Sequence, residues 1–166
     1  MTDHEQTNAL EVAITNEMRE RKFYLKHAQM AKNPLGRAMF EQIADDELEH
    51  YHMLKQIEAS WKTNDSFPET VPAKIKGTDV KRILKDLLEA TDGLPETDDS
   101  ELEALRTAMD FEASGVALYT RLRDLVADPK EKAFFNLLAQ MEQEHYLALK
   151  KTKDYLTDPS AWFEKA

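Results

Sequence analysis

Residues 40–54 read FEQIADDELEHYHML, and residues 135–149 read FNLLAQMEQEHYLAL. The second segment repeats the first at an offset of 95 residues, and both contain Glu-x-x-His, at Glu47 and His50 and at Glu142 and His145. In each segment an apolar residue, the Glu, the His and a Leu recur at intervals of three and four positions. That spacing is typical of a helix face turned toward a bundle core. The two segments therefore predict two core helices that carry the same polar pair.

The same offset extends the repeat to the segments that precede these two helices. Glu17 aligns with Glu112, and Tyr24 aligns with Tyr119. Each of these glutamates lies 30 residues before the Glu of Glu-x-x-His, within a stripe of Leu and Ala, and each Tyr follows its Glu by seven residues. The halves, about residues 3–60 and 101–157, therefore predict two copies of one helical hairpin.

The composition favours an all-α protein of one domain. The chain has 166 residues, the size of one domain, and we expect residues 1–166 to form it. With 33% charged residues, 4 Gly and 6 Pro, it contains long stretches of good helix formers. We expect long helices at about residues 3–31, 34–60, 101–126 and 128–156. A short amphipathic helix at about 79–90 would interrupt a long crossover, residues 61–100.

Two hairpins joined by a long crossover have the connectivity of ferritin-like four-helix bundles, whereas a simple up-down bundle, which stays open here, needs only short loops. Ser100 and Glu103 have the spacing of a capping box and predict the start of the third long helix. After the fourth long helix, the aromatic residues in segment 161–163 predict a tail that packs on the bundle.

Charge and cysteine content exclude several classes of function. A net charge of -10 opposes binding to nucleic acid or to an anionic membrane surface. Because the chain has no cysteine, it has no iron–sulfur site of its own, and electrons would have to come from an external donor. The first residues are polar and acidic, and no stretch is apolar enough to span a membrane, so we expect a cytoplasmic protein.

The phased glutamates and histidines predict a centre of two metal ions. Four carboxylates in one core would each cost several kcal/mol, roughly, unless protonated or paired, and the core stripes offer no Lys or Arg. Two divalent ions would balance the four charges. The alternative is a set of polar core residues that bond to one another. Glu and His suit iron, and also manganese or mixed metals. The six predicted ligands are Glu17, Glu47, His50, Glu112, Glu142 and His145.

At these residues the chain resembles the rubrerythrin branch of the ferritin-like superfamily, over about residues 10–155. The resemblance identifies Glu17 and Glu112 with the family's terminal glutamates, and it identifies the Glu-x-x-His residues with its bridging glutamates and its histidines. It implies a di-iron site that reduces hydrogen peroxide, and a homodimer or small homo-oligomer. Typical members take electrons through a rubredoxin domain. Here a separate rubredoxin or reductase would have to replace that domain.

The chain departs from the family at one position. Classical rubrerythrins carry an extra glutamate three residues after the second terminal glutamate, and it exchanges with a histidine as one iron changes oxidation state. That position is Gly115, and its repeat partner is Glu20. We therefore expect Glu20 to be a seventh ligand that exchanges with His145. In the alternative, Glu20 lies in solvent beside Arg19, Arg21 or Lys22.

These residues leave three functions open. The first is an oxidoreductase that reduces peroxide or oxygen. The second is a ferroxidase or iron storage protein, and the third is a metal-dependent structural or sensory bundle. Tyr24 and Tyr119 would donate hydrogen bonds to ligand carboxylates or pass an electron, although packing alone would also explain them. Glu49 and Glu144 follow the ligand glutamates by two residues and should face solvent.

Overall fold

The computed structural model describes residues 3–68, 79–90 and 97–159, and these residues form helices without a strand. Four of the helices are long, and α3 is short. Their bounds, in chain order, are α1 at Asp3–Met30, α2 at Pro34–Asn64, α3 at Val80–Ala90, α4 at Asp99–Leu125 and α5 at Pro129–Thr157. Within the described ranges, no helix is long and apolar enough to span a membrane.

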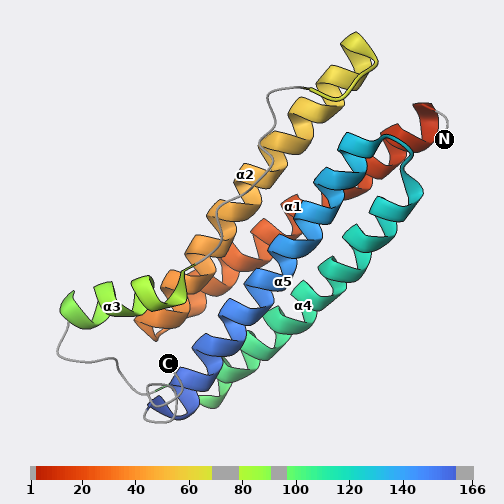
Figure 1. Cartoon of the computed structure of the whole chain (residues 1–166). Helices are drawn as coiled ribbons and strands as arrows, with labels where there is room; N and C mark the ends of the chain where they lie inside the picture. Colours follow the sequence, from red (N-terminus) through yellow and green to blue (C-terminus); the bar gives the residue numbers. More distant parts are fainter. Residues whose placement is uncertain (1–2, 69–78, 91–96, 160–166) are drawn as a thin grey trace.

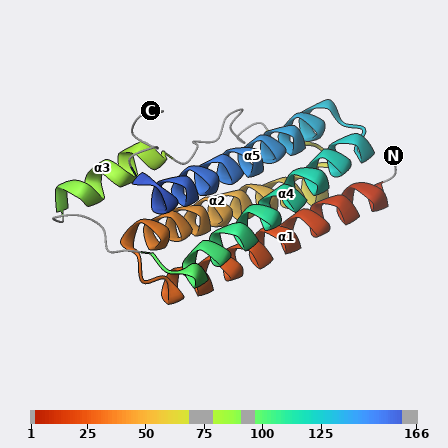
Figure 2. The same ribbon diagram turned by 90° about the horizontal axis from the view of Figure 1, so that it is seen from below.

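The long helices form two hairpins that pack into one four-helix bundle (Figure 1). Helix α1 packs along α2, and α4 packs along α5, while the two hairpins meet through α2 with α5 and α1 with α4. The short helix α3 lies at one end of the bundle against α2 and α5, as the second view also shows (Figure 2). The predicted all-α, ferritin-like bundle of two hairpins is confirmed.

Two element boundaries differ from those expected. Helix α2 continues to Asn64, beyond the expected residue 60, and ends at Asp65, whose φ of 51° is a left-handed conformation that Asp tolerates. Helix α4 begins at Asp99, and its N-cap is Asp98, which accepts from the Glu101 N–H at 2.9 Å. Ser100 is therefore not the cap. Its hydroxyl donates to Asp98 at 2.7 Å instead. Segments 69–78 and 91–96 of the crossover and the aromatic tail at 161–163 lie outside the described residues.

The repeat also sets the starts of the second and fourth long helices. Asn33 caps α2 by accepting from the Leu35 N–H at 2.9 Å, and its repeat partner Asp128 caps α5 by accepting from the Lys130 N–H at 2.9 Å. In both helices Pro occupies the first turn, where a missing N–H costs no helical hydrogen bond. Both helices therefore begin at equivalent points of the two hairpins, so that their Glu-x-x-His pairs lie at the same height.

Most of the core lies in two large apolar clusters, one toward each end of the bundle, and a third, smaller cluster contains Leu35, Leu84 and Tyr155. Along every long helix the chain passes from one large cluster to the other, and the predicted ligands lie in the interval between them. One cluster includes Leu10, Ala13, Leu54, Ile57, Tyr119, Phe135 and Leu138. The other includes Tyr24, Phe40, Ile43, Leu105, Ala108 and Leu149. The packing thus places a polar layer at mid-height with apolar side chains on both sides.

Candidate metal centre

All six predicted ligands lie in this polar layer, and none has exposed surface. Helices α1 and α4 each supply one glutamate, while α2 and α5 each supply a Glu-x-x-His pair. The six side chains are Glu17, Glu47, His50, Glu112, Glu142 and His145. The expected outward direction of Glu49 and Glu144 is confirmed, because both are exposed.

Ligand atoms of these residues form two overlapping groups, and in each group they lie within 4.8 Å of one another. One group contains Glu17 and His50, and the other contains Glu112 and His145. Both groups contain Glu47 and Glu142. Two adjacent cation positions that share two carboxylates would account for this arrangement, as in di-iron and di-manganese carboxylate bundles.

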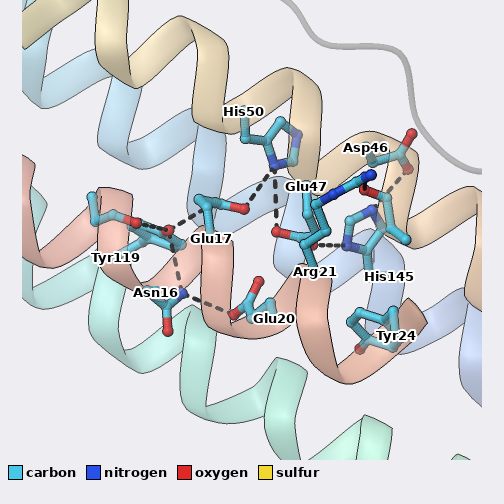
Figure 3. A network of polar contacts seen from close by, with 12 residues as sticks. Asn16, Glu17, Glu20, Arg21, Tyr24, Asp46, Glu47, His50, Tyr119 and His145 are labelled. Atoms are coloured by element: carbon cyan, nitrogen blue, oxygen red, sulfur yellow. Dashed lines mark hydrogen bonds and ion pairs between the residues drawn. The ribbon is translucent and has the colours of Figure 1, made fainter. Parts of the chain in front are cut away.

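The two histidines present the same ring atom to the carboxylates. His145 Nδ1 lies 3.2 Å from Glu47 Oε1 and 3.3 Å from Glu112 Oε1. His50 Nδ1 lies 3.5 Å from Glu17 Oε2 and 3.9 Å from Glu47 Oε2 (Figure 3). The ring centroids are 6.2 Å apart. Each imidazole therefore directs Nδ1 toward Glu47 and toward one terminal glutamate.

The ligand atoms lack the hydrogen bonds that would otherwise stabilise them in a core. Within the described parts of the chain, neither carboxylate oxygen of Glu47 or Glu142 has a hydrogen-bond partner, and neither does Nδ1 of His50 or His145. A buried polar group without a partner costs roughly 1–3 kcal/mol, and more when it is charged. Carboxylate oxygens and imidazole nitrogens that face one another without hydrogen-bond partners are ligand atoms that fit two bound divalent cations.

The pKa values report the same crowding of negative charge. Burial, and then the charge of neighbouring carboxylates, raises the pKa of Glu47 and of Glu142 well above the usual value. Burial opposes ionisation of Glu17 as well, but the charge of His50 and the hydrogen bonds that Glu17 makes together outweigh burial and lower the pKa. Burial would lower the pKa of His145, whereas the carboxylates of Glu112 and Asp46 raise it to about 10. In the absence of cations, the groups with raised pKa values in this layer therefore bind protons instead.

Tyr24 and Tyr119 link the two halves of the repeat. Tyr24 donates to Glu112 Oε1 at 2.6 Å, and Tyr119 donates to Glu17 Oε1 at 2.7 Å. Each hydroxyl thus reaches the terminal glutamate of the opposite hairpin. Burial, followed by the charge of that glutamate, raises the pKa of both tyrosines, so the hydroxyls keep the proton that they donate.

Glu20 lies inside the polar layer rather than in solvent. Its side chain is 1% exposed, and Oε1 accepts from Asn16 Nδ2 at 2.8 Å. Burial and then the charges of Glu112 and Glu17 raise its pKa to about 8. A Cβ atom added at Gly115 would lie 2.1 Å from Glu142 Oε2 and 3.1 Å from Glu20 Oε1, so the Glu142 carboxylate occupies the space that a side chain at 115 would need, next to Glu20. The arginine at 21 bonds elsewhere, to the Ala44 carbonyl at 2.9 Å.

Asp46 and Asn16 are buried members of this layer that the sequence interpretation missed. Asp46 is 6% exposed and accepts from His145 Nε2 at 2.9 Å, while Asn16 is 5% exposed and lies between Glu20 and Tyr119. A signal for Asp46 was present: it follows Ile43 by three residues and precedes His50 by four. Its repeat partner is apolar. A charged residue at a core-facing position of that kind indicates a specific buried partner.

Comparison with known proteins agrees with this geometry. Residues 8–153 match the family model described as Rubrerythrin. No curated protein and no solved structure matches the chain. Proteins of this family bind a di-iron centre, and the clustered Glu and His side chains are groups that could hold such ions. Because the match covers most of the chain and includes every candidate ligand, the chain belongs to the rubrerythrin family.

Proposed function

We propose that this chain is a di-iron oxidoreductase that reduces hydrogen peroxide, or oxygen, with electrons from an external donor. The observation that carries the proposal is the pair of overlapping ligand groups that share Glu47 and Glu142. Two ions held side by side suit a reaction that needs two electrons at once. When bound, two ferrous ions would supply the two electrons that convert hydrogen peroxide and two protons into two water molecules, and the donor would then return both electrons.

The protein residues have distinct roles in this proposal. The four glutamates in the two ligand groups balance the charge of two divalent ions, and the histidines bind as neutral imidazoles. Tyr24 and Tyr119 hold the terminal glutamates in place through hydrogen bonds of 2.6 and 2.7 Å. The apolar clusters on both sides of the layer restrict water, which strengthens the electrostatic interactions within it.

Glu20 would add a fifth carboxylate to the centre. Its Oε2 has no hydrogen-bond partner in the described ranges. Its Oε1 would lie 3.1 Å from a Cβ atom at Gly115, where the Glu142 carboxylate fills the space. We propose Glu20 as the seventh ligand. Glu20→Gln should retain both metal ions yet slow peroxide reduction by about tenfold or more, which corresponds to roughly 1.4 kcal/mol of barrier. Glu49→Gln, an exposed control on α2, should not change the rate.

The decisive experiment combines metal content, turnover and native mass. Protein from its native host should contain two iron ions per chain, and Glu142→Ala should contain fewer. With a reductant present, the rate of peroxide reduction should exceed the rate at which oxygen oxidises added ferrous iron. The native mass should be that of a dimer or small oligomer. A shell of many subunits that accumulates ferric mineral would instead establish iron storage. Full loading of Glu142→Ala would remove the basis of the assignment.

A further inference from the structure

The two halves of the repeat surround their histidines differently. His145 donates from Nε2 to Asp46 Oδ2 at 2.9 Å (Figure 3). Gln42 donates to the other oxygen of Asp46 at 3.0 Å. The repeat partner of Asp46 is Met141, which is 2% exposed and carries no acceptor of comparable strength. Among the described residues, His50 Nε2 has no hydrogen-bond partner. One imidazole is therefore anchored to a carboxylate, and the other is not.

This bond has two consequences for binding a cation. When the His145 imidazole is neutral, its hydrogen bond to Asp46 keeps the one proton on Nε2. The lone pair is then on Nδ1, the atom that faces Glu47 and Glu112. A carboxylate that accepts from the remote N–H also makes an imidazole a stronger electron donor to a metal. In the part of the chain that the structure describes, His50 has no carboxylate on Nε2 to fix its tautomer or to increase its electron donation. Its tautomer and orientation are therefore set only when an ion binds.

We propose that Asp46 makes the two cation positions unequal, so that the position bounded by His145 and Glu112 binds a divalent cation more tightly and fills first. The position bounded by Glu17 and His50 fills second. The inference rests on the proposed metal centre and adds an order of loading to it. Asp46 acts as a positioning residue, because it touches the imidazole rather than the ion.

The repeat makes the comparison well controlled. Both positions share the same two glutamates, and each has one terminal glutamate that accepts from one tyrosine. Two carboxylates break the symmetry, Asp46 opposite Met141 and Glu20 opposite Gly115. A variant of each therefore separates their contributions. Asp45 is the matched control for Asp46, since it is the neighbouring aspartate on the same helix but is exposed.

The test is an anaerobic titration of the apoprotein with Co²⁺, followed by visible absorption and calorimetry. Wild type should bind two ions in two steps of one equivalent each. Asp46→Asn should weaken the tight step by about 10–100-fold and leave the weak step unchanged. Asp45→Asn should leave both steps unchanged, and Glu20→Gln should leave them unequal. The inference would be overturned if Glu20→Gln bound both ions with equal affinity while Asp46→Asn kept the wild-type difference in affinity between the two steps.

Histidine variants assign the steps independently and do not depend on whether Asp46→Asn folds. His145→Ala should lose the tight step, and His50→Ala should lose the weak step. The reverse result would overturn the inference while leaving the two-ion centre intact. Wild type that binds fewer than two Co²⁺ ions would contradict the metal centre itself, so the two failures can be told apart. Circular dichroism of each apo variant confirms that its helices have formed.

Discussion

Gly115→Ala should separate the stability of the fold from the integrity of the metal centre. A Cβ atom at this position would lie 2.1 Å from Glu142 Oε2 and 2.8 Å from Glu142 Cδ. Both atoms belong to the far end of a flexible side chain, so the chain can accommodate the new methyl group by rotating the Glu142 carboxylate. The helix backbone need not move. The cost therefore falls on Glu142, which, like Glu47, belongs to both candidate cation positions.

The magnitude follows from these contacts. Ordinary contacts between non-bonded heavy atoms are about 3.5–4.0 Å, so the Glu142 oxygen must retreat by roughly 1 Å or more. The side chains of a metal or catalytic site tolerate displacements of only about 0.5 Å. We therefore expect metal affinity to fall by at least about tenfold, or roughly 1.4 kcal/mol. Replacing Gly by Ala inside a helix gains up to about 1 kcal/mol, which offsets much of the strain in the apoprotein.

The assay is thermal unfolding of the apo and metal-loaded proteins, together with metal content. For Gly115→Ala, the melting temperature of the apoprotein should stay within about 4 °C of wild type, and the increase on metal loading should shrink. Gly36→Ala is the matched control, because a Cβ atom at Gly36 has no atom within 4 Å. It should raise both melting temperatures slightly and keep both ions.

One result would refute this reasoning. If Gly115→Ala binds two ions with wild-type affinity, the Glu142 carboxylate does not need the position that it occupies beside Gly115. A large loss of apoprotein stability with unchanged metal binding would likewise place the role of Gly115 in helix packing rather than in the centre.

Three further predictions concern the apoprotein, a cap and the tyrosines. Because the pKa of Glu20 is raised from 4.5 to about 8 in the folded state, folded apoprotein binds more protons than unfolded chain across that interval, and its stability should fall as pH rises through it. Melting temperatures of chelator-treated protein at pH 5.5 and 8 test this, and an increase with pH would contradict it. Metal-loaded protein should show the opposite trend, since protons compete for the ligands. Asp128→Ala should lower the free energy of unfolding by about 1 kcal/mol without loss of metal, whereas Asp128→Asn, which keeps the cap, should match wild type in chemical denaturation. Tyr24→Phe and Tyr119→Phe should each weaken metal binding by about tenfold in the same titration, and by similar factors, because each removes one hydrogen bond to a terminal glutamate; unchanged affinities would assign both tyrosines to packing alone.

The repeat explains why so much of the bundle was predictable. Helical phase depends only on spacing along one helix, so the intervals around Glu47 and His50 place both side chains on the core face without knowledge of the other helices. A second copy at Glu142 and His145 made coincidence improbable and set the hairpin connectivity. The six predicted ligands therefore lie in one layer of the structure, although their binding of metal stays a prediction.

The boundaries were less predictable because they depend on local competition. Asp98, Ser100 and Glu101 all suit the start of a helix, and only the backbone geometry shows that Asp98 accepts from the Glu101 N–H. Likewise, α2 continues past residue 60 to Asn64 and stops where Asp65 adopts a left-handed conformation. No residue in that stretch forces an earlier end.

The sequence by itself determined which residues face the core, since that property belongs to each helix separately. The tertiary structure decided which of them meet, because partners across a bundle depend on the offset and rotation of the packed helices. It joined Tyr24 to the glutamate of the opposite hairpin, buried Glu20 rather than leaving it in solvent, and placed Asp46 against His145. No spacing along one helix contains that information, and the proposed inequality of the two cation positions follows from it.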